Sequence, residues 1–199
     1  KTYQDQADKK LSLTVGSVNA KLEGDRTVVR QQQTNLGRLI ARTQRERTGA
    51  DLAVMNSGGI RDSIQAGSVS YKDILRVQPF GNLIGSVVLS GKELRAYLQT
   101  IALKEPGSGG YPQFDGVTLK TDYAKKQVSD IRINGKPIND AQTYRLSLSD
   151  YLANGGDGYP KLSDKPSYVN TGFVDADALK QYFEKHSPID AAGFAPEKE

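Results

Sequence analysis

Four short segments of the chain place glycine beside an arginine, an aromatic residue or an acid, directly after an apolar run. They are Gly24-Asp25-Arg26 with Arg30, Asn56 to Asp62, Gln78 to Asn82, and Tyr151 to Tyr159. Glycine at the end of a strand lets the backbone approach a ligand closely, and the neighbouring side chains then line the opening. Each segment alone is typical of an ordinary turn. Their joint occurrence indicates a ligand site built from several loops.

Three kinds of side chain in these segments suggest what the ligand is. The ring of Phe80 follows Pro79, which indicates a loop position where the ring faces outward. Two such rings facing each other hold a nucleobase by stacking, which contributes about 1 to 3 kcal/mol per base. Asp157 lies between glycines and can accept hydrogen bonds from a vicinal diol. Arginine suits planar contact with a phosphate or carboxylate, and the arginines are concentrated in the first 80 residues.

Composition removes several kinds of catalytic centre. The 199 residues contain no Cys, so disulfides, thiolate metal sites and a cysteine nucleophile are excluded. His186 is the single histidine, which leaves too few ligands for a His-rich metal centre, and we expect it to be solvated or to cap a helix. No run of 18 apolar residues occurs, so the sequence predicts no membrane-spanning helix. The formal net charge of +4 is a weak attraction for polyanions.

The elements that must position these residues form a mixed pattern of helices and strands. Apolar spacing and a following Gly49 predict a helix over 35–48, on which Arg42, Arg45 and Arg47 are expected to form the wet face. Capping boxes at Ser70 and Ser90 predict two more helix starts. Other periodic segments predict strands at 11–18, 52–55, 117–120, 128–133 and 144–148, and a helix at 175–185.

Glycine and proline mark the connections between these elements. The 106–112 stretch is predicted to be a loop, and Asn134-Gly135 predicts a tight hairpin. Residues 1–10 read as a polar, frayed lead-in, and 11–199 as one α+β domain with mixed sheets flanked by helices. Because Lys1 is neither an initiator Met nor part of an apolar leader, we expect the chain to be a processed or excised segment.

The four motifs in this order closely resemble the C-terminal domain of 5′-nucleotidases, above all the bacterial periplasmic enzymes that also hydrolyse UDP-sugars. They read Gly-Asp-Arg-x-x-x-Arg at 24–30, Asn-x-Gly-Gly-Ile-Arg-Asp at 56–62, Gln-Pro-Phe-Gly-Asn at 78–82, and Asn-Gly-Gly-Asp-Gly-Tyr at 154–159. The resemblance covers the chain from about Leu13 to about Pro188. It implies a domain that binds the nucleotide substrate.

The resemblance also implies a role for each matching residue. The base is clamped between two aromatic rings that match Phe80 and Tyr151, and Asp157 matches the aspartate that takes the ribose hydroxyls. The remaining substrate-binding residues implied by the resemblance are Arg26, Arg30 and Arg61 toward the phosphate or ribose end, Asn56 and Asn82 near the sugar and base, and Gly109 on the base side. The second clamp residue is typically Phe in the bacterial relatives, so Tyr151 is a departure, and Tyr159 is the alternative ring.

The family divides binding and hydrolysis between two domains. The resemblance therefore implies no catalytic residue, metal ligand or cofactor in this chain. It implies two divalent metal ions in a separate N-terminal metallophosphoesterase domain outside this chain, which is the expected partner. The expected ligands are nucleoside monophosphates and UDP-sugars, the expected location is periplasmic or secreted, and neither a membrane nor a nucleic acid is an expected partner.

Two other interpretations use the same residues. The first is a non-catalytic binding module for single-stranded nucleic acid or an acidic glycan, for which affinity grows with oligomer length and falls steeply with salt. The second is a domain that keeps the fold only as a spacer or interaction surface. Binding of a mononucleotide as tightly as an oligonucleotide argues against the first, and binding of any nucleoside argues against the second.

Overall fold

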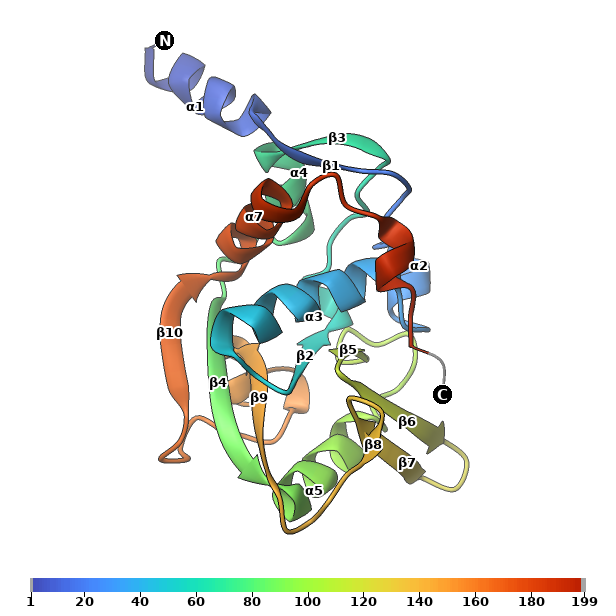
Figure 1. Cartoon of the computed structure of the whole chain (residues 1–199). Coiled ribbons are helices and arrows are strands. Elements are labelled where there is room, and N and C mark those ends of the chain that lie inside the picture. Colours follow the sequence, from blue (N-terminus) through green and yellow to red (C-terminus); the bar gives the residue numbers. More distant parts are fainter. Residues whose placement is uncertain (1, 198–199) are drawn as a thin grey trace.

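A mixed five-stranded sheet forms the centre of the computed structural model, which describes residues 2–197 (Figure 1). The strand order is β10-β4-β9-β2-β5, in which β2 and β9 run parallel and the other neighbours are antiparallel. The strands are β2 (Leu52–Asn56), β4 (Leu83–Ser90), β5 (Pro112–Asp115), β9 (Thr143–Ser149) and β10 (Val169–Val174). Strands and helices mix within one unit, so the predicted α+β class is confirmed.

Two smaller sheets flank the central one. They consist of β1 (Thr14–Val18) with β3 (Gly67–Ser70), and of β6 (Val117–Asp122), β7 (Gln127–Ile133) and β8 (Lys136–Pro137). The turn between β7 and β8 has φ of 51° at Asn134 and 82° at Gly135. Positive φ at both central residues is what a tight hairpin turn requires, so the predicted Asn-Gly hairpin is confirmed.

Helices cover both faces of the central sheet. The helices are α1 (Thr2–Ser12), α2 (Arg26–Val29), α3 (Asn35–Thr48), α4 (Tyr71–Val77), α5 (Gly91–Ile101), α6 (Asp150–Ala153) and α7 (Asp175–His186), with short 3₁₀ turns at η1 (Ser57–Gly59), η2 (Gly156–Gly158) and η3 (Ala191–Phe194). On β2, Leu52 and Val54 join the apolar cluster beneath α5, whereas Met55 joins the cluster beneath α3. Because β2 is buried on both faces, its sequence is a continuous apolar run rather than an alternating one.

Helix ends follow the signals in the sequence. Helix α3 ends at Gly49, which has a left-handed φ of 66°. Both predicted capping boxes are present: the Ser70 side chain accepts from the backbone N–H of Asp73, and Ser90 accepts from Glu93. In each pair the acid accepts from the serine N–H in return, which satisfies donors that a helix start leaves free.

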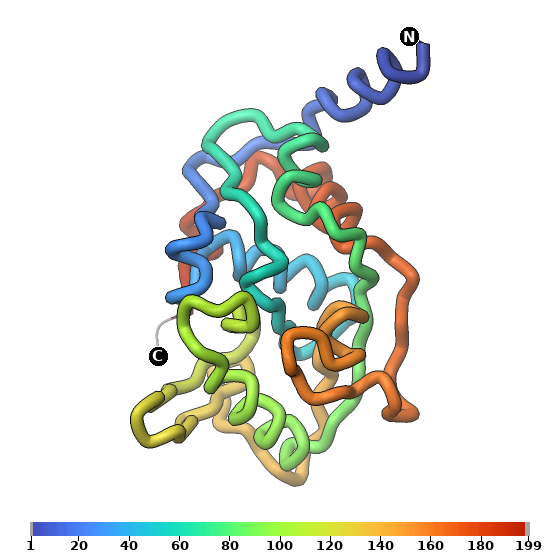
Figure 2. Tube along the Cα trace, turned by 180° about the vertical axis from the view of Figure 1, so that it is seen from behind, coloured from blue at the N-terminus to red at the C-terminus, as the bar shows by residue number. Residues whose placement is uncertain are grey.

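The N-terminal segment differs from its prediction. Residues 2–12 form helix α1 instead of a frayed lead-in, and β1 consequently begins at Thr14 rather than at Leu11. The helix extends away from the body of the molecule in both ribbon views (Figures 1 and 2), and none of its described side chains is buried. The first turn of α1 contains Asp5 and its last turn contains Lys9 and Lys10, so these charges complement the helix dipole. Because the helix has no apolar face, a search for hydrophobic periodicity does not detect it.

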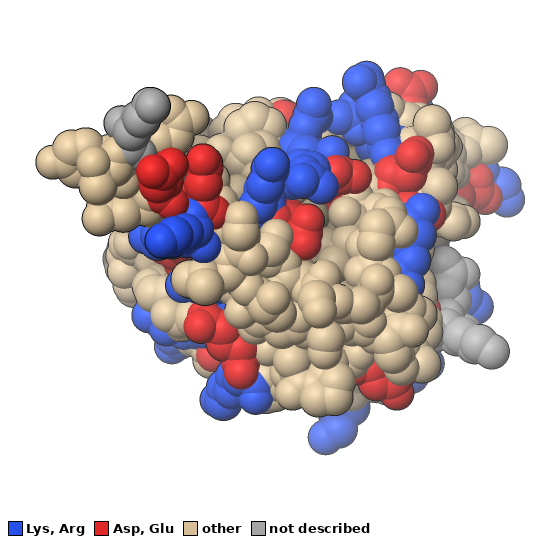
Figure 3. Space-filling view, turned by 90° about the horizontal axis from the view of Figure 1, so that it is seen from above, with Lys and Arg blue, Asp and Glu red and all other residues tan. Residues whose placement is uncertain are grey.

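Charged side chains of both signs are interspersed on the face of the molecule that Figure 3 shows. Figure 3, viewed from above, shows Lys and Arg lying beside Asp and Glu, with tan surface between the groups. On the described part of that face the basic residues form no continuous stripe. A surface of this kind gives weak long-range attraction for a polyanion.

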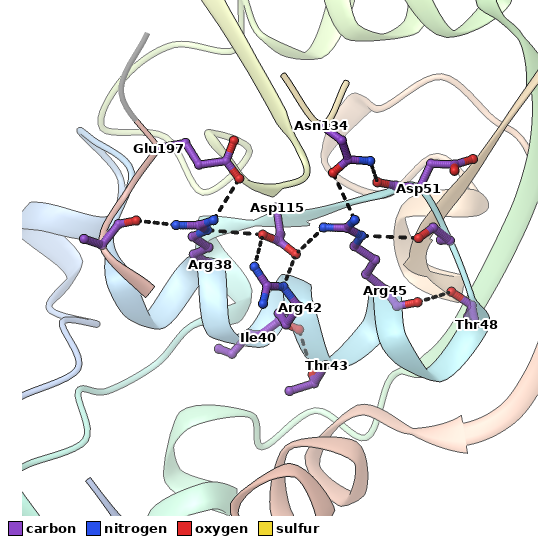
Figure 4. A network of polar contacts seen from close by, with 12 residues as sticks. Arg38, Ile40, Arg42, Thr43, Arg45, Thr48, Asp51, Asp115, Asn134 and Glu197 are labelled. Atoms are coloured by element: carbon purple, nitrogen blue, oxygen red, sulfur yellow. Dashed lines mark hydrogen bonds and ion pairs between the residues drawn. The ribbon is translucent and has the colours of Figure 1, made fainter. Parts of the chain in front are cut away.

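One buried carboxylate collects three arginines from α3 (Figure 4). Asp115 at the end of β5 has a fully buried side chain and contacts Arg42 at 2.6 Å, Arg38 at 3.2 Å and Arg45 at 3.2 Å. Burial alone raises the pKa of Asp115, but the hydrogen bond and charge of Arg42, with Arg38 and Arg45, outweigh it and hold the pKa below its ordinary value. Helix α3 is therefore tied to the sheet edge through charge as well as through apolar packing.

This cluster corrects the prediction for the arginines of α3. Arg42 and Arg45 do not form a wet face, because both pair with the buried carboxylate of Asp115 and their side chains are only about one-quarter exposed. Arg47 alone of the three is exposed, and its guanidinium carbon lies 3.6 Å from the centroid of the Phe173 ring. Helical periodicity predicts the face of the helix on which an arginine lies. It does not predict that an acidic residue from a distant strand, here Asp115 on β5, contacts that arginine.

Candidate functional site

A pocket of about 420 Å³ opens where the four glycine-containing segments meet. Its lining consists of Arg30, Asn56, Gly58, Gly59, Phe80, Asn82, Gly109, Tyr151 and Asp157. Seven of the nine residues predicted as substrate-binding are in this lining, although they come from positions up to 127 residues apart in the sequence. The two others, Arg26 and Arg61, lie beside lining residues rather than among them.

Two aromatic rings face this pocket with much of their surface free. Phe80 is 59% exposed and Tyr151 is 42% exposed, and neither belongs to the apolar core. Tyr159, the alternative ring, is 3% exposed, packs edge-on against Tyr97 and donates from its hydroxyl to the Gly110 carbonyl at 2.7 Å. Tyr159 is thus a core residue, so its assignment as a clamp ring is wrong.

Asp157 stands between two hydrogen-bond donors of the pocket. The Asn56 amide donates to Oδ2 at 2.8 Å, and the Tyr151 hydroxyl donates to Oδ1 at 2.5 Å. This hydrogen bond to Asp157 raises the pKa of Tyr151. Asp157 has a left-handed φ of 55°, which a non-glycine residue adopts only where its surroundings require it. The fold therefore fixes this carboxylate at the pocket wall.

Three arginines lie near one another at the pocket. Partial burial, followed by the positive charges of Arg26 and Arg61, lowers the pKa of the Arg30 guanidinium, while the charge of Asp157 acts in the opposite direction. The guanidinium carbon of Arg61 lies 5.8 Å from the centroid of the Phe80 ring. Repulsion among the three cations is relieved when an anion binds between them.

Close backbone contacts explain the glycines. The Gly58 N–H donates to the Gly109 carbonyl at 2.8 Å, and a Cβ on Gly58 would lie 3.0 Å from the Gly109 Cα. A Cβ on Gly24 would lie 2.1 Å from the Asp62 carbonyl oxygen. Seen from behind in Figure 2, the loop after α5 crosses beside the end of β2. These glycines let one motif pack directly on the next.

Two residues not predicted from the sequence, Asp150 and Lys104, form hydrogen bonds with the segments that line the pocket. The Asp150 carboxylate accepts from the backbone N–H of Leu83 at 3.0 Å and of Tyr151 at 2.8 Å, which joins the segment after Phe80 to the backbone that carries the Tyr151 ring. Lys104 donates to the Gly158 carbonyl at 3.1 Å. In the sequence Asp150 signals only a helix start, because nothing there shows that Leu83 lies beside it.

The first residue of α7 holds the Asn82 side of the pocket and carries a perturbed carboxyl group. The Asp175 N–H donates to the Asn82 carbonyl at 2.9 Å, and the Asp175 side chain is almost fully buried. Burial raises the pKa of Asp175 from 3.8 to about 7, against the opposing hydrogen bond from the Ala176 N–H, and the charges of Asp150 and Asp177 add to the rise.

We therefore expect the stability contribution of Asp175 to decrease as the pH rises. The folded state holds this proton more tightly than the unfolded state, so the contribution is complete below about pH 4 and is lost as the pH passes through about 7. Replacing Asp175 by Asn should remove this part of the pH dependence. Urea unfolding of both proteins at pH 5 and pH 8 measures it, and an equal difference in unfolding free energy at the two pH values contradicts it.

Histidine and carboxylates do not gather into a metal site in the described chain. Among residues 2–197, no group of three or more His, Cys, Asp or Glu side chains is arranged to hold a metal ion. His186 is exposed in the last turn of α7, as expected, and its ring centroid lies 4.3 Å from that of Tyr182. Within the same residues, no helix is both long and apolar enough to span a bilayer.

Comparison with known proteins identifies the family. Residues 14–164 match the family model described as the C-terminal domain of 5′-nucleotidase. The chain is 53% identical over 197 residues to protein UshA of Yersinia enterocolitica and 53% identical over 197 residues to a 5′-nucleotidase of Vibrio vulnificus. Each comparison covers 99% of this chain but only 36% and 35% of the relative.

A solved structure shows the same fold. The crystal structure of a 5′-nucleotidase precursor from Thermus thermophilus has a TM-score of 0.83 and 29% identity, over 92% of this chain and 39% of that one. The chain thus spans little more than a third of the length of these relatives. The family-model match, the relatives and the shared fold agree with the resemblance carried by the four motifs. The chain belongs to the family of 5′-nucleotidase C-terminal domains.

Proposed function

We propose that this domain binds the base and sugar of a nucleotide and presents the phosphate to a separate N-terminal metallophosphoesterase domain. The observation that carries the proposal is a single pocket lined by two exposed aromatic rings, a carboxylate and Arg30. The positive charges of Arg26 and Arg61 act on the Arg30 guanidinium. In this assignment Phe80 and Tyr151 stack on the base, and Asp157 accepts from the ribose hydroxyls. Arg26, Arg30 and Arg61 attract the phosphate end.

The chain's contribution to hydrolysis is positional. The described residues form no cluster of metal ligands, so no metal-dependent step is assigned to them. The two divalent ions belong in our proposal to the N-terminal domain, where they supply the hydrolytic chemistry. Holding a substrate in the correct orientation lowers the entropic cost of reaching the transition state, which is the part that this domain supplies.

The names of the relatives support a proposal for the substrates and the location. Proteins named UshA or 5′-nucleotidase match nearly the whole chain. We take nucleoside monophosphates as the principal ligands and UDP-sugars as further ones, and we place the parent protein in the periplasm or outside the cell. In this proposal Asn56 and Asn82, which line the pocket, contact the sugar and base, and Gly109, also in the lining, lies on the base side.

Titration calorimetry with adenosine monophosphate tests the proposal directly. Two stacking faces and a few exposed ionic contacts must offset the entropy of association, so we expect a dissociation constant of roughly 10 µM to 1 mM for the isolated domain. Absence of any nucleoside or nucleotide binding by a folded sample, verified by circular dichroism, contradicts it and favours a spacer or interaction domain.

Salt should separate the arginine contacts from the stacking contacts. Raising the ionic strength from about 0.05 M to 0.5 M should weaken the binding of adenosine monophosphate several-fold. Salt screens the attraction between the phosphate and the solvent-accessible side chains of Arg26, Arg30 and Arg61. Adenosine, which lacks the phosphate, should bind almost equally at both salt concentrations. Equal salt dependence of the two ligands shows that the arginines do not face the phosphate.

An oligonucleotide tests the rival class of function. A module for single-stranded nucleic acid or an acidic glycan requires a charged path longer than one nucleotide, whereas the charges in Figure 3 alternate in sign over the described surface of that face. We expect a hexanucleotide to bind no more tightly than a mononucleotide. Affinity that rises steadily with oligomer length favours the rival.

A further inference from the structure

The hydroxyl of Tyr151 is engaged with the carboxylate of Asp157. It donates to Asp157 Oδ1 at 2.5 Å, while the Asn56 amide donates to Oδ2 at 2.8 Å. Each oxygen of the carboxylate therefore has one protein donor. A phenol has a single O–H to donate, so this contact occupies it.

The remaining acceptor capacity of Asp157 matches a pair of hydroxyls. A carboxylate oxygen accepts at about two positions, so one position stays open on each oxygen once the protein donors are counted. Asp157 lines the pocket, which leaves these positions available to a ligand. The hydroxyls of a vicinal diol lie on adjacent carbons and can donate one hydrogen bond to each oxygen.

Backbone geometry makes Tyr151 and Asp157 one unit. A Cβ on Gly156 would lie 2.6 Å from Cε2 and Cζ of Tyr151, so the ring packs directly on the glycine backbone one residue before the acid. Asp157 itself has a left-handed φ of 55°. The ring cannot shift without moving the Gly-Gly-Asp turn, and the hydroxyl extends this coupling to the carboxylate.

On the basis of the nucleotide-binding function proposed above, we propose that the Tyr151 hydroxyl is a positioning group that makes the pocket selective for ribose over deoxyribose. It holds the Asp157 carboxylate in the orientation in which both oxygens meet the sugar diol. A phenylalanine at this position would keep the stacking ring but lack this hydrogen bond. The Tyr151 hydroxyl therefore concerns the sugar and not the choice among bases.

Calorimetry on Tyr151→Phe measures this effect with adenosine, 2′-deoxyadenosine and 9-methyladenine as probes. We expect adenosine to bind about tenfold more weakly than to the original protein, which is the usual contribution of a hydrogen bond to a charged group. The affinity for 9-methyladenine, which has no sugar, should be unchanged. The affinity for 2′-deoxyadenosine should fall by a smaller factor than the affinity for adenosine. The ratio of ribonucleoside to deoxyribonucleoside affinity should fall.

Two further variants exclude a general structural effect. In an Asp157→Asn background, adding Tyr151→Phe should cause no further loss of adenosine affinity, because the hydroxyl acts through that carboxylate. Tyr123→Phe is the matched control, since Tyr123 is also 42% exposed but lies outside the pocket, and it should change nothing. An unchanged ratio in Tyr151→Phe, or additive losses in the double variant, overturns the inference. Failure of the original protein to bind adenosine at all instead overturns the proposed function.

Discussion

Replacing Phe80 by alanine should weaken adenosine binding by about 5- to 150-fold, because stacking of a base on one aromatic ring contributes about 1 to 3 kcal/mol. Tyr151→Ala should lose at least as much, since it removes both a ring and the hydroxyl that holds Asp157. Both rings are outside the apolar core, so neither truncation leaves a cavity there. Titration calorimetry gives the affinities, and thermal unfolding shows whether the fold is retained.

Two controls decide whether the loss belongs to stacking. Phe80→Tyr preserves an aromatic face at the same position and should retain most of the affinity. Tyr123→Ala removes a ring of the same exposure as Tyr151 from a site outside the pocket, and it should leave affinity unchanged. Unchanged affinity in both Phe80→Ala and Tyr151→Ala shows that the base is not clamped between these rings.

Local signals in the sequence predicted much of the fold. The capping boxes at Ser70 and Ser90, the glycine that ends α3 and the Asn134-Gly135 hairpin all depend on neighbours within four residues. Such contacts form wherever the residues occur in that order, so pattern alone identifies them. Strands β4 and β10 were not predicted. Strand β4 is buried along most of its length and so lacks a regular alternation, and β10 is an exposed edge strand without the alternation that a buried face imposes.

The long-range charge contacts could not be predicted in the same way. Asp115 and Arg42 are 73 positions apart, and only the packing of α3 against β5 brings them together. Helix α1 was not predicted because its sequence is mostly polar and has no apolar face, so it lacks the hydrophobic periodicity that indicates a helix. Patterns of burial reveal many, though not all, of the elements that pack on the core, and they miss the polar helix α1.

The candidate site shows the same division. Its residue types were evident from glycine, aromatic and acidic residues at the ends of apolar runs, and most of the predicted residues do line one pocket. The partners that orient them were not evident. Asn56 is 101 positions from Asp157, so the hydrogen bond between them exists only because β2 and the loop after α6 end at the same edge of the fold.

The largest expected effect on stability is at Asp115. Replacing it by Asn removes the anion that Arg42 and Arg45 contact, while Arg38 keeps its ion pair with Glu197, and breaking a buried ion pair in this way costs about 3 to 5 kcal/mol. For a chain of this length that corresponds to a fall in the melting temperature of roughly 6 to 20 °C. Thermal and urea unfolding at pH 7 measure the change.

The pH dependence gives a second test of the same cluster. The pKa of Asp115 lies below its ordinary value of 3.8 in the folded state, so its contribution is present at neutral pH and is lost as the pH falls through the folded-state pKa. The difference in stability between the original protein and Asp115→Asn should therefore shrink in acid. Asp140→Asn breaks an exposed pair with Arg95 and should cost less than about 1 kcal/mol.

Stability and ligand affinity should separate between Asp115 and Phe80. Asp115 is outside the pocket lining and acts on α3, whereas β2 and the loops carry the groups that meet the ligand. Asp115→Asn should thus unfold at a lower temperature yet bind adenosine normally while folded, and Phe80→Ala should show the reverse. A loss of affinity in folded Asp115→Asn, matching that of Phe80→Ala, contradicts this separation and places the ion cluster in control of the pocket.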